Sequence, residues 1–140
     1  MAQIDDTVII DWGRFEQARA SLGVNFFRVL GYFREDGGKA VRAIEEAMRS
    51  LNAGAMIVPA DMIKVEGIQL GALAVAELAE DIEFQARDCV EWHQSPAMLL
   101  EDVVQLRALF DQAIAAFDQE TNPLQVRRPG ERRGAALEIR

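Results

Sequence analysis

The chain has 140 residues and a mass of 15.6 kDa, enough for one domain that buries a core without disulfides or a structural metal. Hydrophobic residues make up 50% of the chain and charged residues 27%, and four prolines with ten glycines leave little room for a many-turned β fold. The formal net charge is −8, which argues against a protein that binds nucleic acid.

Two further features of the composition concern the compartment. Asp5 and Asp6 stand where a secretory signal needs basic residues, and no apolar run approaches the roughly 20 residues of a membrane span. We therefore expect a cytoplasmic protein that does not associate with a membrane. Cys89 is the only cysteine, so it cannot form an internal disulfide or a cysteine-based zinc site, and we expect a half-buried, unreactive thiol.

The first three helices are expected over residues 12–22, 25–36 and 39–51, because apolar side chains recur there at helical spacing. Asp11 is placed to cap the first of them. The Asp36-Gly37-Gly38 sequence is expected to separate the second helix from the third.

A fourth, long helix is predicted over residues 59–88, with Pro59 in its first turn, where no backbone donor is needed. Ser95 and Pro96 are typical of a helix start, and the fifth helix is expected to run to about residue 121. No stretch alternates as a half-buried strand does. The predicted fold class is all-α: an up-down antiparallel four-helix bundle over residues 1–121 with a short extra N-terminal helix.

Residues 122–140 differ in composition from the rest of the chain. They contain five arginines and two glutamates, whereas residues 1–121 contain 10 basic and 21 acidic side chains. With two prolines, two glycines and few large hydrophobic residues, this segment is predicted to be a flexible basic tail. It is expected to be solvated or to pack against the acidic body, in preference to binding an acidic partner.

The predicted long helix carries two apolar stripes on opposite sides. One is expected to face the bundle and consists of Ile63, Gly67, Leu70, Ala74 and Leu78. The other surrounds Asp61 and consists of Lys64, Val65, Ile68, Ala72, Val75 and Ala79. The second stripe is either covered by another helix or exposed as a partner site, and the pattern alone leaves both possibilities open.

Residues 60–72, with the sequence ADMIKVEGIQLGA, resemble the signature helix of the histidine-containing phosphotransfer (HPt) domain. That signature has an Ala-His-x-Leu-Lys-Gly run followed by small residues and then Leu-Gly. The similarity extends to about Thr121, in the order Asn25-Phe26-Phe27, Phe33, Leu51-Asn52, Leu78, Glu83 and a leucine-rich last helix. The resemblance implies a four-helix bundle whose partner is a response-regulator receiver domain.

Three positions depart from the family pattern. Asp61 stands in place of the phosphorylated histidine, Val65 in place of a glycine, and Glu66 in place of a small residue. A neutral imidazole can attack an aspartyl phosphate, whereas a carboxylate would repel the incoming phosphoryl group. We therefore expect no catalytic residue in this chain and no enzymatic activity.

Other candidate chemistry is sparse. His93, the only histidine, is expected in a loop near a helix end, and Lys64 is expected to pair with Asp61 three residues earlier. The sequence contains no Gly-rich phosphate loop and no Glu-x-x-His pair for a di-iron site. We expect neither a metal nor another cofactor.

The sequence thus predicts a degenerate HPt module of phosphorelay signalling that binds a receiver domain, either free or within a hybrid histidine kinase. The expected contact residues are Asp61, Lys64, Val65, Ile68, Ala72 and Val75. Two alternatives remain: an active phosphotransfer intermediate with an unconventional acceptor at Asp61 or His93, and a structural bundle that self-associates through the second stripe. The oligomeric state is left open.

Overall fold

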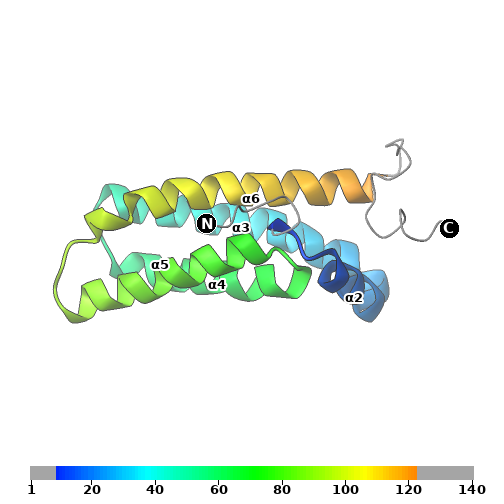
Figure 1. The fold of residues 1–140 in the computed structure, drawn as a ribbon, viewed down its shortest axis with the longest axis horizontal. Coiled ribbons are helices and arrows are strands. Elements are labelled where there is room, and N and C mark those ends of the chain that lie inside the picture. Colours follow the sequence, from blue (N-terminus) through cyan, green and yellow to red (C-terminus); the bar gives the residue numbers. More distant parts are fainter. Residues whose placement is uncertain (1–8, 123–140) are drawn as a thin grey trace, which may run out of the picture.

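A computed structural model describes residues 9–122 of the chain, and all of the regular structure in this range is helical (Figure 1). Five α-helices follow one another: α2 (Trp12–Leu22), α3 (Phe26–Arg49), α4 (Gly54–Leu70), α5 (Leu73–Glu91) and α6 (Leu100–Thr121). Short 3-10 turns at Gly23–Asn25 and Pro96–Leu99 precede α3 and α6. The all-α prediction is confirmed for this part of the chain, in which no helix is long and apolar enough to cross a membrane.

The caps that the sequence predicts for α2 and for the turn before α6 are present. The Asp11 carboxylate accepts a hydrogen bond from the Arg14 backbone N–H at 3.1 Å, and Gly23 ends α2 with a φ of 55°. The Ser95 hydroxyl accepts from the Ala97 N–H at 3.1 Å, with Pro96 at the first position of the 3-10 turn. The segment expected to be a basic tail lies outside the described residues after Asn122.

The expected break at residues 36–38 is wrong, because α3 is continuous through Gly37 and Gly38. Both glycines are buried, and a Cβ on Gly37 would lie 2.7 Å from Cε1 of Phe110. Gly37 therefore lets the Phe110 ring of α6 approach the α3 backbone closely. In this position a glycine serves helix packing and does not end the helix.

The predicted helix over residues 59–88 is also wrong, because it consists of two helices that meet at Gly71 and Ala72. Helix α4 starts at Gly54 and includes Pro59 in its interior. Gly71 adopts a left-handed φ of 87°, and the Ala72 N–H bonds back to the Gly67 carbonyl at 2.8 Å, which closes the end of α4. Gly67 also brings α4 and α5 together, since a Cβ there would lie 3.3 Å from Cβ of Ala76.

The four long helices alternate in direction along the long axis of the molecule (Figure 1). Helix α3 packs against α4 and α6, and α5 packs against the same two helices. Ion pairs link α3 to α6 on the surface, between Glu45 and Arg107 at 2.9 Å and between Arg34 and Asp118. Burial of the apolar faces between these helices accounts for the core.

Helix α2 lies across the end of the molecule where α6 finishes (Figure 1). Its Phe15 is fully buried and stacks on Phe117 of α6, with ring centroids 5.1 Å apart, while Trp12 meets the same ring edge-on at 6.3 Å. The Asp11 N–H donates to the Gly71 carbonyl at 2.7 Å. The N-terminal segment is therefore anchored both to α6 and to the turn between α4 and α5.

Candidate functional site

Helix α4 separates its residues between the core and the surface as the sequence predicts. Ile63, Gly67 and Leu70 are buried, whereas Val65 is 56% exposed and Ile68 41% exposed. Ala74 and Leu78, predicted to continue the bundle-facing stripe, are half-buried on α5. The second stripe is thus accessible on α4, and the alternative that another helix covers it does not hold at these positions.

The expectation that this stripe continues through Ala72, Val75 and Ala79 is wrong. All three are 0% exposed, so Ala72 and Val75 cannot contact a partner on the folded protein. The reason is the turn at Gly71, which interrupts the helical register on which the prediction rests. Beyond Gly71 the chain reverses direction, and residues that would lie on the outer side of one straight helix point into the core.

The exposed apolar surface extends in the other direction, to Val58, which is 76% exposed. Val58 was not predicted as part of this surface, because the helix was expected to start at Pro59. Val58, Asp61, Lys64, Val65 and Ile68 recur at three- and four-residue spacing on one side of α4, and we call this surface the α4 face. It is apolar along its length, with a charged pair near its middle.

Lys64 connects two helices on the α4 face. Its Nζ atom lies 3.2 Å from Oδ1 of Asp61, as predicted, and 3.1 Å from Oε1 of Glu83 on α5. Glu83 is buried, and its other oxygen pairs with Arg87 at 2.9 Å. The hydrogen bonds that the Lys64 amine donates to the carboxylates of Glu83 and Asp61 raise the pKa of Lys64 above its usual value. The Lys64 ammonium group therefore forms ion pairs with two carboxylates and is not available to bind an anion.

Glu66 lies on the α3 side of the same helix. Burial, together with the negative charge of Asp36, raises the pKa of its carboxyl group. With Asp61 half-exposed a little more than one turn earlier, the middle of α4 presents two carboxyl groups and one neutralised amine. This arrangement favours contact with an apolar or cationic surface over contact with a phosphoryl group.

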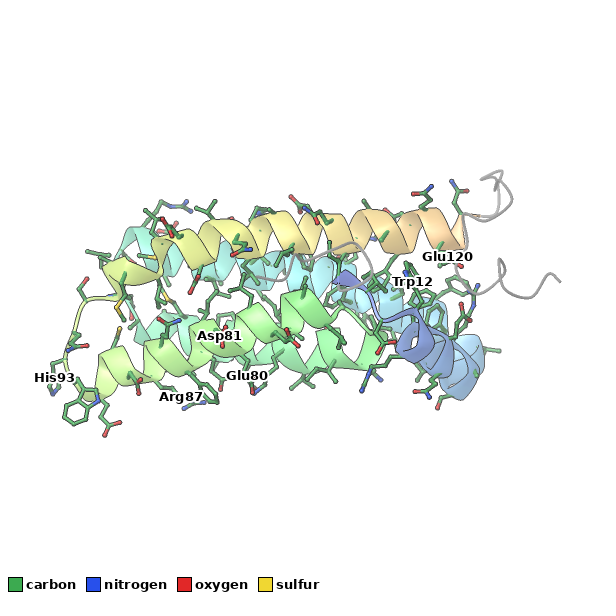
Figure 2. The ribbon with its side chains drawn as sticks, viewed as in Figure 1. Trp12, Glu80, Asp81, Arg87, His93 and Glu120 are labelled. Atoms are coloured by element: carbon green, nitrogen blue, oxygen red, sulfur yellow. The ribbon has the colours of Figure 1, made fainter. Side chains whose placement is uncertain are left out.

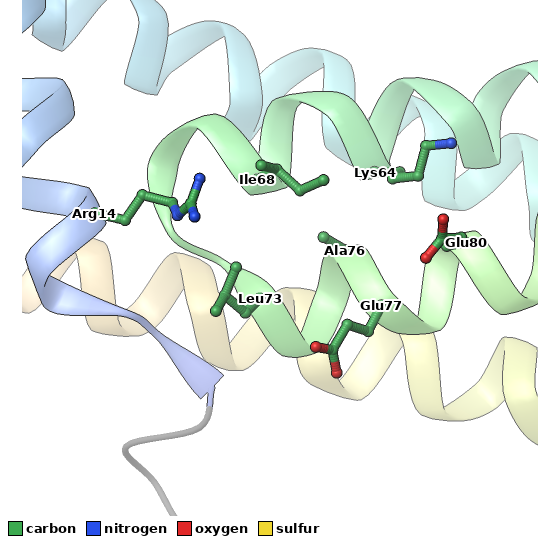
Figure 3. A pocket seen from close by; sticks show the side chains of 7 residues that line it. All are labelled: Arg14, Lys64, Ile68, Leu73, Ala76, Glu77 and Glu80. Carbon is green, nitrogen blue, oxygen red and sulfur yellow. The ribbon is translucent and has the colours of Figure 1, made fainter.

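A pocket of about 230 Å³ adjoins the Ile68 end of the α4 face, between α2, α4 and α5 (Figure 3). Ile68, Leu73 and Ala76 supply its apolar lining. Arg14 enters it from α2, and Glu77 and Glu80 border it on α5.

The other residues that the sequence singled out lie away from this face. His93 is exposed in the turn after α5, with a φ of 53°, at the opposite end of the molecule from Trp12 (Figure 2). Cys89 is 1% exposed, more buried than expected, and its Sγ lies 3.7 Å from the Ser95 carbonyl oxygen. No group of three or more potential metal ligands occurs within residues 9–122.

No family model matches the chain, and no curated protein and no solved structure is significantly similar to it.

Proposed function

We propose that this chain is an HPt-like module of two-component phosphorelay signalling that binds a response-regulator receiver domain and does not accept its phosphoryl group. The proposal treats α3, α4, α5 and α6 as the up-down antiparallel four-helix bundle of that family. It implies a cytoplasmic binding protein and not an enzyme, and a partner that is either a free receiver domain or the receiver of a hybrid histidine kinase.

The observation that carries the proposal is the α4 face itself. It combines exposed apolar side chains with a carboxylate, Asp61, at the position where the family resemblance places the acceptor histidine. Such a face can supply the central apolar anchors of an interface, with charged groups beside them that adjust encounter and orientation. It therefore retains what docking requires and lacks the nucleophile that transfer requires.

The surroundings of Asp61 support binding over transfer. Its carboxylate is paired with Lys64, which also pairs with the buried Glu83, so the lysine charge is not available to stabilise an incoming phosphoryl group. The nearby Glu66 adds a further acidic group on α4. A module of this kind would act by occupying a receiver and blocking its phosphodonor.

The proposal is tested by titrating the purified chain against a panel of receiver domains from its source organism, by calorimetry. We expect at least one receiver to bind. Ile68→Glu should weaken that binding about thirty-fold or more, because it buries an unpaired charge in the interface. Val104→Glu makes a comparable change at a valine on α6 that is 62% exposed, and it should leave the affinity unchanged.

Two results would contradict the proposal. One is that no receiver in a complete panel binds, and the other is that both glutamate variants weaken binding equally. Thermal unfolding of the two variants serves as the control for folding, since Ile68 and Val104 are both exposed and neither change should unfold the protein.

Self-association is the second candidate function, and the exposed Val58 and Val65 favour it. A second copy could cover the apolar part of the α4 face in a symmetric dimer. Sedimentation of the chain over a range of concentrations separates the two candidates: a receiver-binding module stays monomeric, whereas a self-associating bundle forms dimers that Ile68→Glu abolishes.

A further inference from the structure

The pocket beside the α4 face has charged groups that the folded body does not pair. Within residues 9–122, Glu77 and Glu80 have no ion-pair partner, although both border the apolar surface formed by Ile68, Leu73 and Ala76 (Figure 3). Lys64 also lines the pocket, but its amine is engaged with Asp61 and Glu83 and does not neutralise them, and Arg14 offsets only one of the two negative charges. An occupant of this pocket should therefore combine apolar side chains with positive charge.

The C-terminal end of α6 lies at the same end of the molecule as this pocket. Phe117, five residues before Asn122, contacts Trp12 of α2, and the neighbouring Asp11 N–H bonds to the Gly71 carbonyl. Leu73, two residues after Gly71, lines the pocket. Eighteen residues follow Asn122, and an extended chain of that length reaches about 60 Å. The segment over residues 123–140 can therefore reach the pocket from its point of attachment.

The composition of residues 123–140 complements the pocket. The segment has five arginines and two glutamates, while residues 1–121 carry 10 basic and 21 acidic side chains. Apolar residues stand near the arginines, with Leu124 and Val126 just before Arg127. Glu131 lies between two arginine pairs. The segment therefore carries a carboxylate that could pair with Arg14 as well as arginines that could pair with the two glutamates of the pocket.

We propose that residues 123–140 dock in this pocket and over the adjoining end of the α4 face, with apolar side chains against Ile68 and Leu73 and arginines paired with Glu77 and Glu80. The segment is then an intramolecular competitor for any partner of the α4 face. A tethered segment has an effective concentration on the order of 1 mM, so a contact with a dissociation constant of about 1 mM occupies the site about half of the time and lowers a competitor's affinity about two-fold.

The experiment uses the full chain without a receiver, so its outcome is independent of the proposed function. In a Cys89→Ala background, Gly134→Cys carries a spin label, and isotope-labelled methyl groups report its proximity by NMR. We expect strong signal loss at Ile68 and Leu73 and none at Val104. The loss should disappear in about 0.5 M salt, where exposed charges are screened within a few ångströms.

A matched pair of double variants tests the assigned contacts. Glu77→Gln with Glu80→Gln should reduce the signal loss at Ile68 several-fold, whereas Asp88→Asn with Glu91→Gln, which removes two exposed carboxylates from the far end of α5, should not. Equal signal loss at Ile68 and Val104, or equal effects of the two double variants, would overturn the proposal. So would signal loss seen only between spin-labelled and isotope-labelled copies in a mixture, because the segment would then dock on another molecule.

Discussion

Gly71 is the residue on which three parts of the fold converge: the end of α4, the start of α5 and the segment that leads into α2. A Cβ at this position would lie 2.5 Å from the Asp11 carbonyl oxygen, and the φ of 87° is already unfavourable for other residues. We predict that Gly71→Ala destabilises the protein by about 2–4 kcal/mol, from the combined cost of the strained backbone and the steric clash. Urea denaturation measures this change.

The control for Gly71→Ala is Gly31→Ala. Gly31 lies within α3 and has no atom within 4 Å of the position of an added Cβ. Alanine there should stabilise the protein by about 0.5–1 kcal/mol through helix propensity. If both variants change stability alike, neither the left-handed backbone nor the approach of Asp11 excludes a side chain at residue 71.

Glu66 gives a pH-dependent prediction. Its pKa is raised in the folded protein, so folding favours the protonated carboxyl group, and ionisation at neutral pH opposes folding. Glu66→Gln should therefore raise the melting temperature at pH 7. Its advantage should shrink as the pH falls through the raised pKa and vanish below the unfolded-state value.

Asp36 supplies the check on the cause of this shift, because its negative charge contributes to the raised pKa of Glu66. Asp36→Asn should reduce the stabilisation that Glu66→Gln produces at pH 7. A stabilisation that is the same at every pH from 3 to 7 would contradict the assignment to Glu66 ionisation.

Among side-chain contacts, the sequence predicts those between residues close in the chain and not those between helices. The contact between Asp61 and Lys64 follows from helical spacing and is confirmed. The contact between Lys64 and the buried Glu83 depends on how α5 folds back against α4. Helical spacing carries no information about a residue on the next helix, so the second contact could not be predicted.

At the scale of elements, the continuity of α3 depends on a close contact with α6. Gly37→Ala gains about 1 kcal/mol of helix propensity but places a Cβ 2.7 Å from the buried ring of Phe110, so we predict a net loss of about 1–2 kcal/mol. Gly38→Ala is the matched control, since its added Cβ would meet only the flexible end of Arg42 at 3.7 Å. That variant should be stabilising, and unfolding curves of the two proteins measure the difference.

Combining Gly37→Ala with Phe110→Leu tests the cause. The smaller side chain removes the clash, so the two changes together should cost less than the sum of their separate effects. Strict additivity would show that the Phe110 ring is not what excludes a side chain at residue 37.

The two wrong predictions of helix boundaries have one physical origin, the role of glycine. Gly37 and Gly38 were expected to separate two helices and Gly71 was expected inside one, but of these three glycines only Gly71 adopts a left-handed backbone. The other two are buried inside α3, and at Gly37 the absence of a side chain lets the Phe110 ring of α6 approach closely. Which role a glycine has depends on its tertiary neighbours, and a single sequence does not contain them.

At the scale of the whole molecule, apolar periodicity predicts the helical class and the core side of α4, because both depend on local spacing. The site is predicted in part: Asp61, Lys64, Val65 and Ile68 lie together on the α4 face, whereas Ala72 and Val75 are buried. The prediction fails beyond the turn at Gly71, because a helical wheel assumes one straight helix.

The whole face, and not one residue, is expected to prevent transfer. Asp61→His alone should give little phosphorylation from a phosphorylated receiver, because the exposed Val65 side chain and the negative charge of the neighbouring Glu66 remain. Asp61→His with Val65→Gly and Glu66→Ser should yield acid-labile label, the signature of phosphohistidine. Equal labelling of the single and triple variants would show that only the missing imidazole matters.

Native mass spectrometry of the unaltered chain, mixed with a phosphorylated receiver to which it binds, measures binding and transfer together. One spectrum reports both the complex and the molecule that carries the phosphoryl group. We predict a one-to-one complex in which this chain keeps its unmodified mass. A chain whose mass has increased by one phosphoryl group would contradict binding without transfer and identify an active phosphotransfer protein.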